Sequence, residues 1–157
     1  MREGTPRPGA AGCLACLWAG LFGLLHFYWA VGGDRGLSVS AGEELAAERP
    51  LWFVVSGLWG VGALCLAGAL LGWALARCRL RGRAGLMARW LGWGVAAMLL
   101  VRGIGVEALL LADAGGLDAS VSEGQRFWTL ALWNPWFVLG GVAFGMAAFT
   151  AGRRSES

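Results

Sequence analysis

The chain has 157 residues, of which 57% are hydrophobic and 15% are charged, and it contains 27 glycines and 10 tryptophans. A soluble domain carries about 25% charged residues, so this composition indicates a membrane protein rich in Gly and Trp. The formal charge of +3 does not indicate a nucleic-acid partner, because the basic residues stand beside the ends of apolar segments instead of forming one patch with aromatic residues.

Four apolar segments are long enough to cross a bilayer as helices. Three bulky aromatic residues stand where a signal peptidase would cut after the first segment, which argues against a cleaved signal peptide. The sequence therefore predicts a single all-α domain over 1–157, a four-helix bundle whose surface meets the lipid bilayer. Its predicted spans are about 9–31, 51–76, 86–112 and 134–151.

The start of the fourth span has two interpretations. Residues 127–151 could form one helix kinked at Pro135. Alternatively, Asn134 is the N-cap and Pro135 the first helical residue, a favoured pair at a helix start. Residues 127–133 would then lie at the membrane interface. We prefer the second interpretation.

Arginine counts predict the orientation. The N-terminus, the connection between the second and third spans, and the C-terminus together hold nine arginines, whereas the other two loops hold three. Positive charge stays on the cytoplasmic side, so we expect a multi-pass protein of the cell membrane with both termini cytoplasmic. Aromatic residues are expected at both interfaces. Those assigned to the outer boundary are Phe27, Tyr28, Trp29, Trp52, Phe53, Trp133 and Trp136, with Trp73 and Trp90 at the inner one.

Polar residues inside the spans are the candidates for function, because an arginine within a bilayer costs about 2.5–3.5 kcal/mol on insertion scales and should face protein or water. Arg102 and Glu107 are five residues apart, about 140° around a helix, so each is expected to find its own partner on another helix. We predict that His26 pairs with Glu107. For Arg102 the expected partners are Asn134, Ser56 or backbone carbonyls.

These residues predict a polar pocket open to the outside that binds an anionic group or relays a proton through His26. Gly103 and Gly105 are expected to leave room for a close neighbour beside the arginine. The alternative is that the polar groups only hold the helices together, at about 0.6 kcal/mol per hydrogen bond. A small oligomeric transporter or proton-coupled carrier is a further hypothesis, although the apolar inner halves of the spans count against it. A binding or accessory protein without enzymatic activity is our leading interpretation.

Other motifs give weaker indications. Cys13 and Cys16 form a CxxC that would suggest a membrane redox protein, but they lie at the cytoplasmic end of the first span. The Gly68/Gly72 and Gly141/Gly145 pairs have helix-packing spacing, which we interpret as internal packing, although a homo-oligomer stays open. The arginine-rich connection around 77–89 could attract anionic lipid. A single histidine leaves no pattern for a metal site or a hydrolytic triad, and no cofactor is expected.

The two outer loops resemble each other. Each carries Gly-Gly followed by Ser-Val-Ser, and a proline precedes a Trp-Phe-Val run in both halves, at Pro50 and Pro135. A duplication would give two hairpins as parallel repeats, whereas chance recurrence in a biased sequence is the alternative. Ser40 and Glu43 in the first loop have capping-box spacing and predict a short surface helix there.

Three separated motifs carry a family resemblance. They are His26-Phe27-Tyr28-Trp29-Ala30 with the following Gly-Gly, Arg102-Gly103, and Trp133-Asn134-Pro135-Trp136-Phe137. Together they resemble an uncharacterised group of small bacterial four-helix membrane proteins, a domain of unknown function, over roughly 21–141. The resemblance implies the four-span architecture but does not indicate which activity the protein has. The family's signature positions would be His26, Trp29, Arg102, Asn134 and Pro135.

Overall fold

The computed structural model describes residues 9–77, 82–112 and 122–156. Within these ranges every regular element is a helix, which confirms the predicted all-α class. In chain order the elements are α1 (Ala10–Ala30), α2 (Leu37–Ala41), α3 (Glu43–Glu48), the π-helical η1 (Phe53–Gly60), α4 (Val61–Arg77), α5 (Gly82–Leu111), α6 (Glu123–Trp128), the π-helical η3 (Thr129–Trp133) and α7 (Asn134–Glu156).

Four helices are long and apolar enough to cross a membrane, which agrees with the four predicted spans and is the property of a membrane protein. The second joins η1 to α4, and the fourth joins α6, η3 and α7 into one long helix. Their bounds are Ala10–Ala30, Phe53–Arg77, Gly82–Leu111 and Glu123–Arg153.

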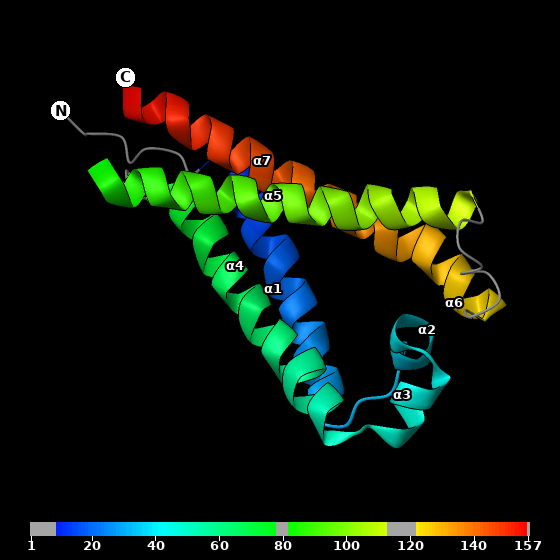
Figure 1. Ribbon diagram of the computed structural model, residues 1–157. Coiled ribbons are helices and arrows are strands. Elements are labelled where there is room, and N and C mark those ends of the chain that lie inside the picture. Colours follow the sequence, from blue (N-terminus) through cyan, green and yellow to red (C-terminus); the bar gives the residue numbers. More distant parts are fainter. Residues whose placement is uncertain (1–8, 78–81, 113–121, 157) are drawn as a thin grey trace.

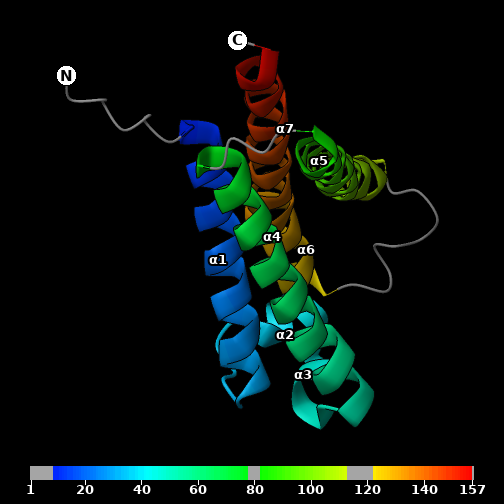
Figure 2. The ribbon, with the colours of Figure 1, turned by 90° about the vertical axis from the view of Figure 1, so that its left-hand side faces the viewer.

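The four long helices form two hairpins. Figure 1 shows α1 lying beside α4 and α5 lying beside α7, with the two pairs close together at one end and diverging as a V toward the other. The start of α1 and the end of α7 lie at the same end, as Figure 2 also shows. The short helices α2 and α3 lie at the open end, between the diverging pairs.

Glycines let the helices of each hairpin approach closely. A Cβ atom at Gly72 of α4 would lie 2.6 Å from the backbone nitrogen of Cys16 in α1. In the other hairpin, a Cβ at Gly141 would lie 2.7 Å from Leu100 Cγ and 3.1 Å from the Ala96 carbonyl oxygen. Both glycine pairs therefore pack helices within the chain, which confirms the predicted internal role.

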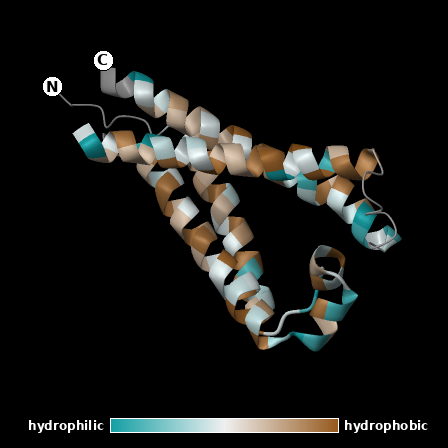
Figure 3. Cartoon of the chain, in the orientation of Figure 1, coloured by the Kyte–Doolittle hydropathy of each residue, from teal (hydrophilic) through white to brown (hydrophobic). Residues whose placement is uncertain are grey.

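The buried core is aromatic and alanine-rich, and the outer surface is apolar. Trp18 of α1 and Phe144 of α7 lie at the centre, where the small side chains of Ala19 and Ala96 allow close packing. Large aliphatic side chains such as Leu64, which is 72% exposed, cover the outside. Figure 3 shows hydrophilic colour at α3, in α6 and at the start of α5. Such an extensive exposed apolar surface fits contact with lipid.

The preferred start of the fourth span is wrong. Asn134 has helical backbone angles (φ −64°, ψ −48°), and the helix continues through Pro135 from α6. The N-cap is Ser122, whose hydroxyl accepts a hydrogen bond from the Gln125 amide at 3.3 Å. A proline ring clashes with the carbonyl of the preceding turn. The wider π-helical turn of η3, which ends two residues before Pro135, accommodates it.

The predicted surface helix is present, but its cap is different. Ser40 lies inside α2, where its hydroxyl donates to the Gly36 carbonyl oxygen at 2.7 Å. The chain breaks at Gly42, whose φ of +95° suits only glycine, and α3 begins directly after it. Pro50 lies at the start of the next helix as expected, because its carbonyl accepts the first amide bonds, from Phe53 and Val54.

Part of the predicted outer aromatic belt belongs to the interior. Trp29 is 3% and Phe53 is 8% exposed, and both pack with Leu37 of α2. Trp52 and Trp90, which are 62% and 69% exposed, remain suited to an interface. Position along a span does not reveal which way a side chain faces, so the sequence could not separate the two groups.

The second half of the loop echo, at 115–121, lies outside the described residues, as do Arg79, Arg81 and Cys78. The two hairpins share an up-and-down arrangement, but Pro50 precedes its helix whereas Pro135 lies within one. Pro135 therefore gains no support as a helix start from the echo, and duplication stays a prediction.

Candidate functional site

An amide bridges the two ionisable groups of α5. Arg102 Nη1 donates to Asn134 Oδ1 at 3.3 Å, and Asn134 Nδ2 donates to Glu107 Oε2 at 2.7 Å. Asn134 is 1% exposed. The predicted partnership of Arg102 with Asn134 is present. The expectation of separate partners is wrong, because both side chains turn toward the same residue of α7 despite their angular separation on α5.

Close approach of α5 and α7 makes this bridge possible. A Cβ atom at Gly103 would lie 2.9 Å from Val138 Cγ2 and 3.0 Å from the Asn134 carbonyl oxygen, closer than normal packing permits. The room predicted beside the arginine is therefore present at Gly103. At Gly105 a Cβ would meet nothing within 4 Å, so that glycine plays no part in the contact.

The Arg102 guanidinium also lies over an aromatic ring. Its Cζ atom is 5.0 Å from the centroid of Phe137, within the range of a cation–π interaction. Phe137 follows Asn134 by three residues and so lies on the same face of the helix. This spacing is a signal that sequence reasoning could have used to find Phe137 and did not.

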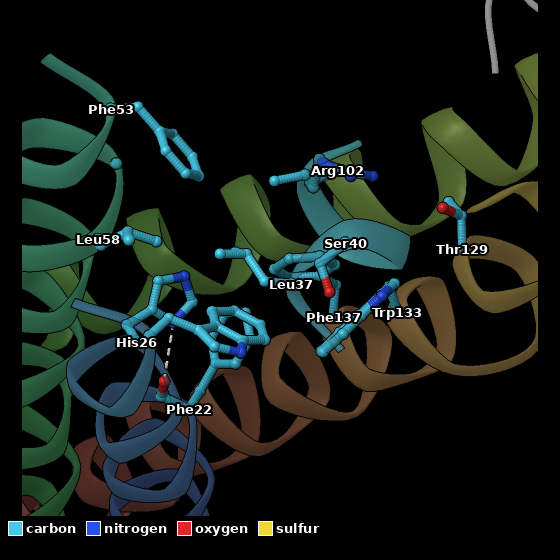
Figure 4. Close-up of a pocket in the computed structure, with 13 residues that line it drawn as sticks. Phe22, His26, Leu37, Ser40, Phe53, Leu58, Arg102, Thr129, Trp133 and Phe137 are labelled. Carbon is cyan, nitrogen blue, oxygen red and sulfur yellow. Dashed lines mark hydrogen bonds between the residues drawn. The ribbon is translucent and has the colours of Figure 1, made fainter. Parts of the chain in front are cut away.

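A pocket of about 180 Å³ opens beside the guanidinium, between the two hairpins (Figure 4). Arg102 enters it from α5. The remaining lining comes from α1, α2, η1, η3 and α7. It is largely apolar, with four polar side chains counting the arginine. Those that shape the argument below are His26, Ser40, Arg102, Thr129, Trp133 and Phe137.

His26 lies in this pocket but does not pair with Glu107. Its Nδ1–H donates to the Phe22 carbonyl oxygen at 2.9 Å, since a carbonyl can only accept (Figure 4). The ring packs edge-on against Phe22 and Trp29, with centroids 4.6 and 5.2 Å away. The predicted pairing is wrong because the Glu107 carboxylate is engaged by Asn134, whereas the imidazole bonds within its own helix.

Ser56 does not join the site. Its side chain is exposed, and its hydroxyl donates to the Trp52 carbonyl oxygen of its own helix. Gly57, the next residue, lines the pocket instead. The sequence placed Ser56 at the correct depth, but depth does not fix the direction of a side chain around the helix.

The short helix α2 covers the pocket. The sequence predicted a short surface helix in this loop but not its position over the pocket. Leu37 and Ser40 line it from above, and Leu37 is 1% exposed. Arg49 holds this segment to the end of α1, donating to the carbonyl oxygens of Trp29, at 2.9 Å, and Gly33. Trp29 Nε1 in turn donates to the Arg35 carbonyl oxygen at 2.9 Å. A loop that folds back between helices leaves no periodic pattern in the sequence.

The remaining candidates lie elsewhere. Cys13 is exposed and Cys16 half-buried on α1, and both thiols are free. Among the residues that the structure describes, no three His, Cys, Asp or Glu side chains gather as a metal site would require. The polar centre of the molecule is therefore the pocket with its bridge Arg102–Asn134–Glu107.

Comparison with known proteins identifies the family to which the chain belongs. No curated protein and no solved structure matches the chain. The sequence model of a family described as "Protein of unknown function (DUF3995)" matches residues 19–144. That range covers most of the chain and includes all three residues of the bridge. The chain belongs to this family of proteins of unknown function.

Proposed function

We propose that this chain is a multi-pass membrane protein, with both termini cytoplasmic, that binds a small molecule carrying an anionic group in the pocket beside Arg102. The observation that carries the proposal is a buried amide, Asn134, that holds the guanidinium of Arg102 at the pocket wall.

Arg102 has donors to offer to a ligand. A guanidinium has five N–H donors. Within the described part of the chain it makes one hydrogen bond, to Asn134, which leaves four. Glu107 fixes the amide so that its oxygen faces the arginine, and Phe137 supports the cation from one side. An arginine pre-positioned in this way suits a carboxylate or phosphate, which it can bind through two parallel hydrogen bonds.

The rest of the pocket suits an apolar or aromatic body. Trp133, Phe22 and Phe53 contribute to its wall, and His26 and Thr129 add single polar groups. Pockets with this mixture bind organic molecules, because apolar walls provide affinity and a few polar groups fix orientation. The ligand class is therefore a small aromatic or aliphatic acid.

The core on the inner side of the pocket supports binding rather than transport. Trp18, Phe144 and small alanines fill the space between the hairpins, and a second apolar cluster of Leu75, Ala88 and Ala147 follows. A carrier needs polar groups along a path through the membrane.

The test uses purified protein in detergent and two probes, 2-naphthylacetate and its methyl ester. We expect the acid to quench pocket tryptophan fluorescence with at least tenfold higher affinity than the ester. Arg102→Gln should weaken acid binding about 10- to 100-fold, since hydrogen bonds to a charged group contribute about 1.5–3 kcal/mol. Ester binding should be unchanged.

Ser56→Ala is the matched control, because that hydroxyl faces away from the pocket. It should leave the affinity for both probes unchanged. Equal affinity of the two probes for the unaltered protein would contradict the proposal, as would an Arg102→Gln variant that folds and still prefers the acid. The bridge would then only hold α5 to α7.

A further inference from the structure

A second hollow lies on the outer face of the α5–α7 hairpin. It has a volume of about 440 Å³, and its lining is wholly apolar, in the size range of ligand sites, about 300–1,000 Å³. Trp93 and Leu100 form one wall from α5, and Val142, Met146 and Phe149 the other from α7. The floor is low because Gly141 and Gly145 have no side chains. This hollow, the α5–α7 groove, runs along the helices on the surface that faces lipid.

Two arginines stand at one end of the α5–α7 groove. Arg89 precedes Trp93 by one helical turn, and Arg153 follows Phe149 by one turn. Because α5 and α7 run in opposite directions, both positions fall at the same end, where α7 finishes. That end is also the one for which the arginine counts predict the cytoplasm.

Their guanidinium groups lie against the groove's own helices. Arg153 Cζ is 4.7 Å from the centroid of Phe149, a residue that also lines the groove. Arg89 lies over Gly152, where a Cβ would come 2.5 Å from its Nη2. The Arg89 Nε is buried and has no hydrogen-bond partner among the described residues. Two cations thus stand at one end of the apolar α5–α7 groove.

We propose that the α5–α7 groove is a binding site for an anionic phospholipid of the cytoplasmic leaflet. One acyl chain lies along Trp93, Leu100 and Val142, and the phosphate lies between Arg89 and Arg153. The acyl chain shields from contact with other molecules an apolar surface that neither hairpin covers. The two arginines supply the charge that distinguishes an anionic from a zwitterionic headgroup. This site is separate from the Arg102 pocket and does not depend on the function proposed for it.

Charge favours a lipid over a second copy of the chain. Two copies in one membrane share an orientation, so a two-fold axis normal to the bilayer would bring equal depths together. Arg89 and Arg153 of one copy would then face the same residues of the other. Four cations would gather at that interface, which opposes association.

The experiment measures lipid contact at Trp93. The full chain is reconstituted in bilayers of equal parts phosphatidylglycerol and phosphatidylcholine, with bromine on the acyl chains of one lipid at a time. Subtracting the signal of Trp93→Phe isolates this tryptophan from the other nine. We expect brominated phosphatidylglycerol to occupy the site at least fivefold more than brominated phosphatidylcholine, about the factor for one basic residue near an anionic surface.

Arg89→Gln with Arg153→Gln should abolish this preference while Trp93 still contacts lipid. Arg83→Gln is the matched control, an exposed arginine six residues before Arg89, and it should keep the preference. Equal quenching by both lipids in the unaltered protein would overturn the proposal, as would a loss of preference in Arg83→Gln as large as in the double variant. Shielding of Trp93 from both lipids would mean that another protein surface covers the groove, and would overturn it too.

Discussion

At the scale of single residues, Asn134 connects the two ionisable side chains of α5. Its amide accepts from Arg102 and donates to Glu107, so one neutral group couples a cation and an anion that stand at different angles on α5. A side-chain amide can do this because it carries a donor and an acceptor together. Leaving the Asn134 amide, which is 1% exposed, without its partners would cost more than each hydrogen bond itself contributes.

This coupling can be measured with a double-mutant cycle of Arg102→Met and Glu107→Gln, using the free energy of unfolding in detergent. We expect an interaction energy of about 0.6–1.7 kcal/mol, the range for polar contacts between membrane helices. With Asn134→Leu as background, the interaction energy should fall by at least half. An interaction energy unchanged in that background would show that the amide does not connect the two groups.

At the scale of helices, the distance between neighbouring helices explains the positions of glycine and proline better than their intrinsic helix propensity does. Gly103 allows α7 to reach α5 at the level of Asn134, whereas Gly105, two residues further, faces open space. The π-helical segment η3 precedes Pro135 within one continuous helix and places Trp133 at the pocket wall. Glycine and proline, which weaken isolated helices, are here tolerated because neighbouring elements use the space and the wider turn that they create.

The two glycines form a matched pair for a test of this reasoning. Gly103→Ala should lower the free energy of unfolding by about 1–3 kcal/mol, since the added methyl group overlaps Val138 and the Asn134 backbone. Gly105→Ala should change it by less than about 0.5 kcal/mol or raise it, because alanine is the better helix former. Unfolding titrations in detergent would compare them, and equal losses would refute the close approach at Gly103.

At the scale of the whole molecule, the two hairpins diverge as a V (Figure 1). The Arg102 pocket lies between them, and residues of α2 form part of its lining. The covering segment is tied to α1 by Arg49. If both termini are cytoplasmic, as proposed, the pocket would lie in the outer half of the bilayer. The basic ends of the helices and the α5–α7 groove would then lie toward the cytoplasmic surface.

Orientation can be tested by cysteine labelling in a variant whose four native cysteines are replaced by serine. An impermeant maleimide added to intact cells should label Glu44→Cys, which lies in α3. It should reach Arg83→Cys, at the start of α5, only after the cells are permeabilised. The reverse pattern would place the pocket on the cytoplasmic side and contradict the positive-inside assignment.

The sequence by itself determined the number of spans, the all-α class and the polar residues within the spans. These follow from hydropathy and charge, which are properties of a segment and need no knowledge of its neighbours. The contact of Arg102 with Asn134 could also be predicted from the sequence, because a cation in an apolar span needs a partner at its own depth.

The tertiary structure determined the directions in which the side chains point. It turned Glu107 toward Asn134 instead of His26, Ser56 away from the pocket and Trp29 into the core, and it folded α2 over the site. In a segment that is apolar on every side, no periodic pattern marks the inward face, so rotation about the helix axis is fixed only when side chains of other helices pack against it.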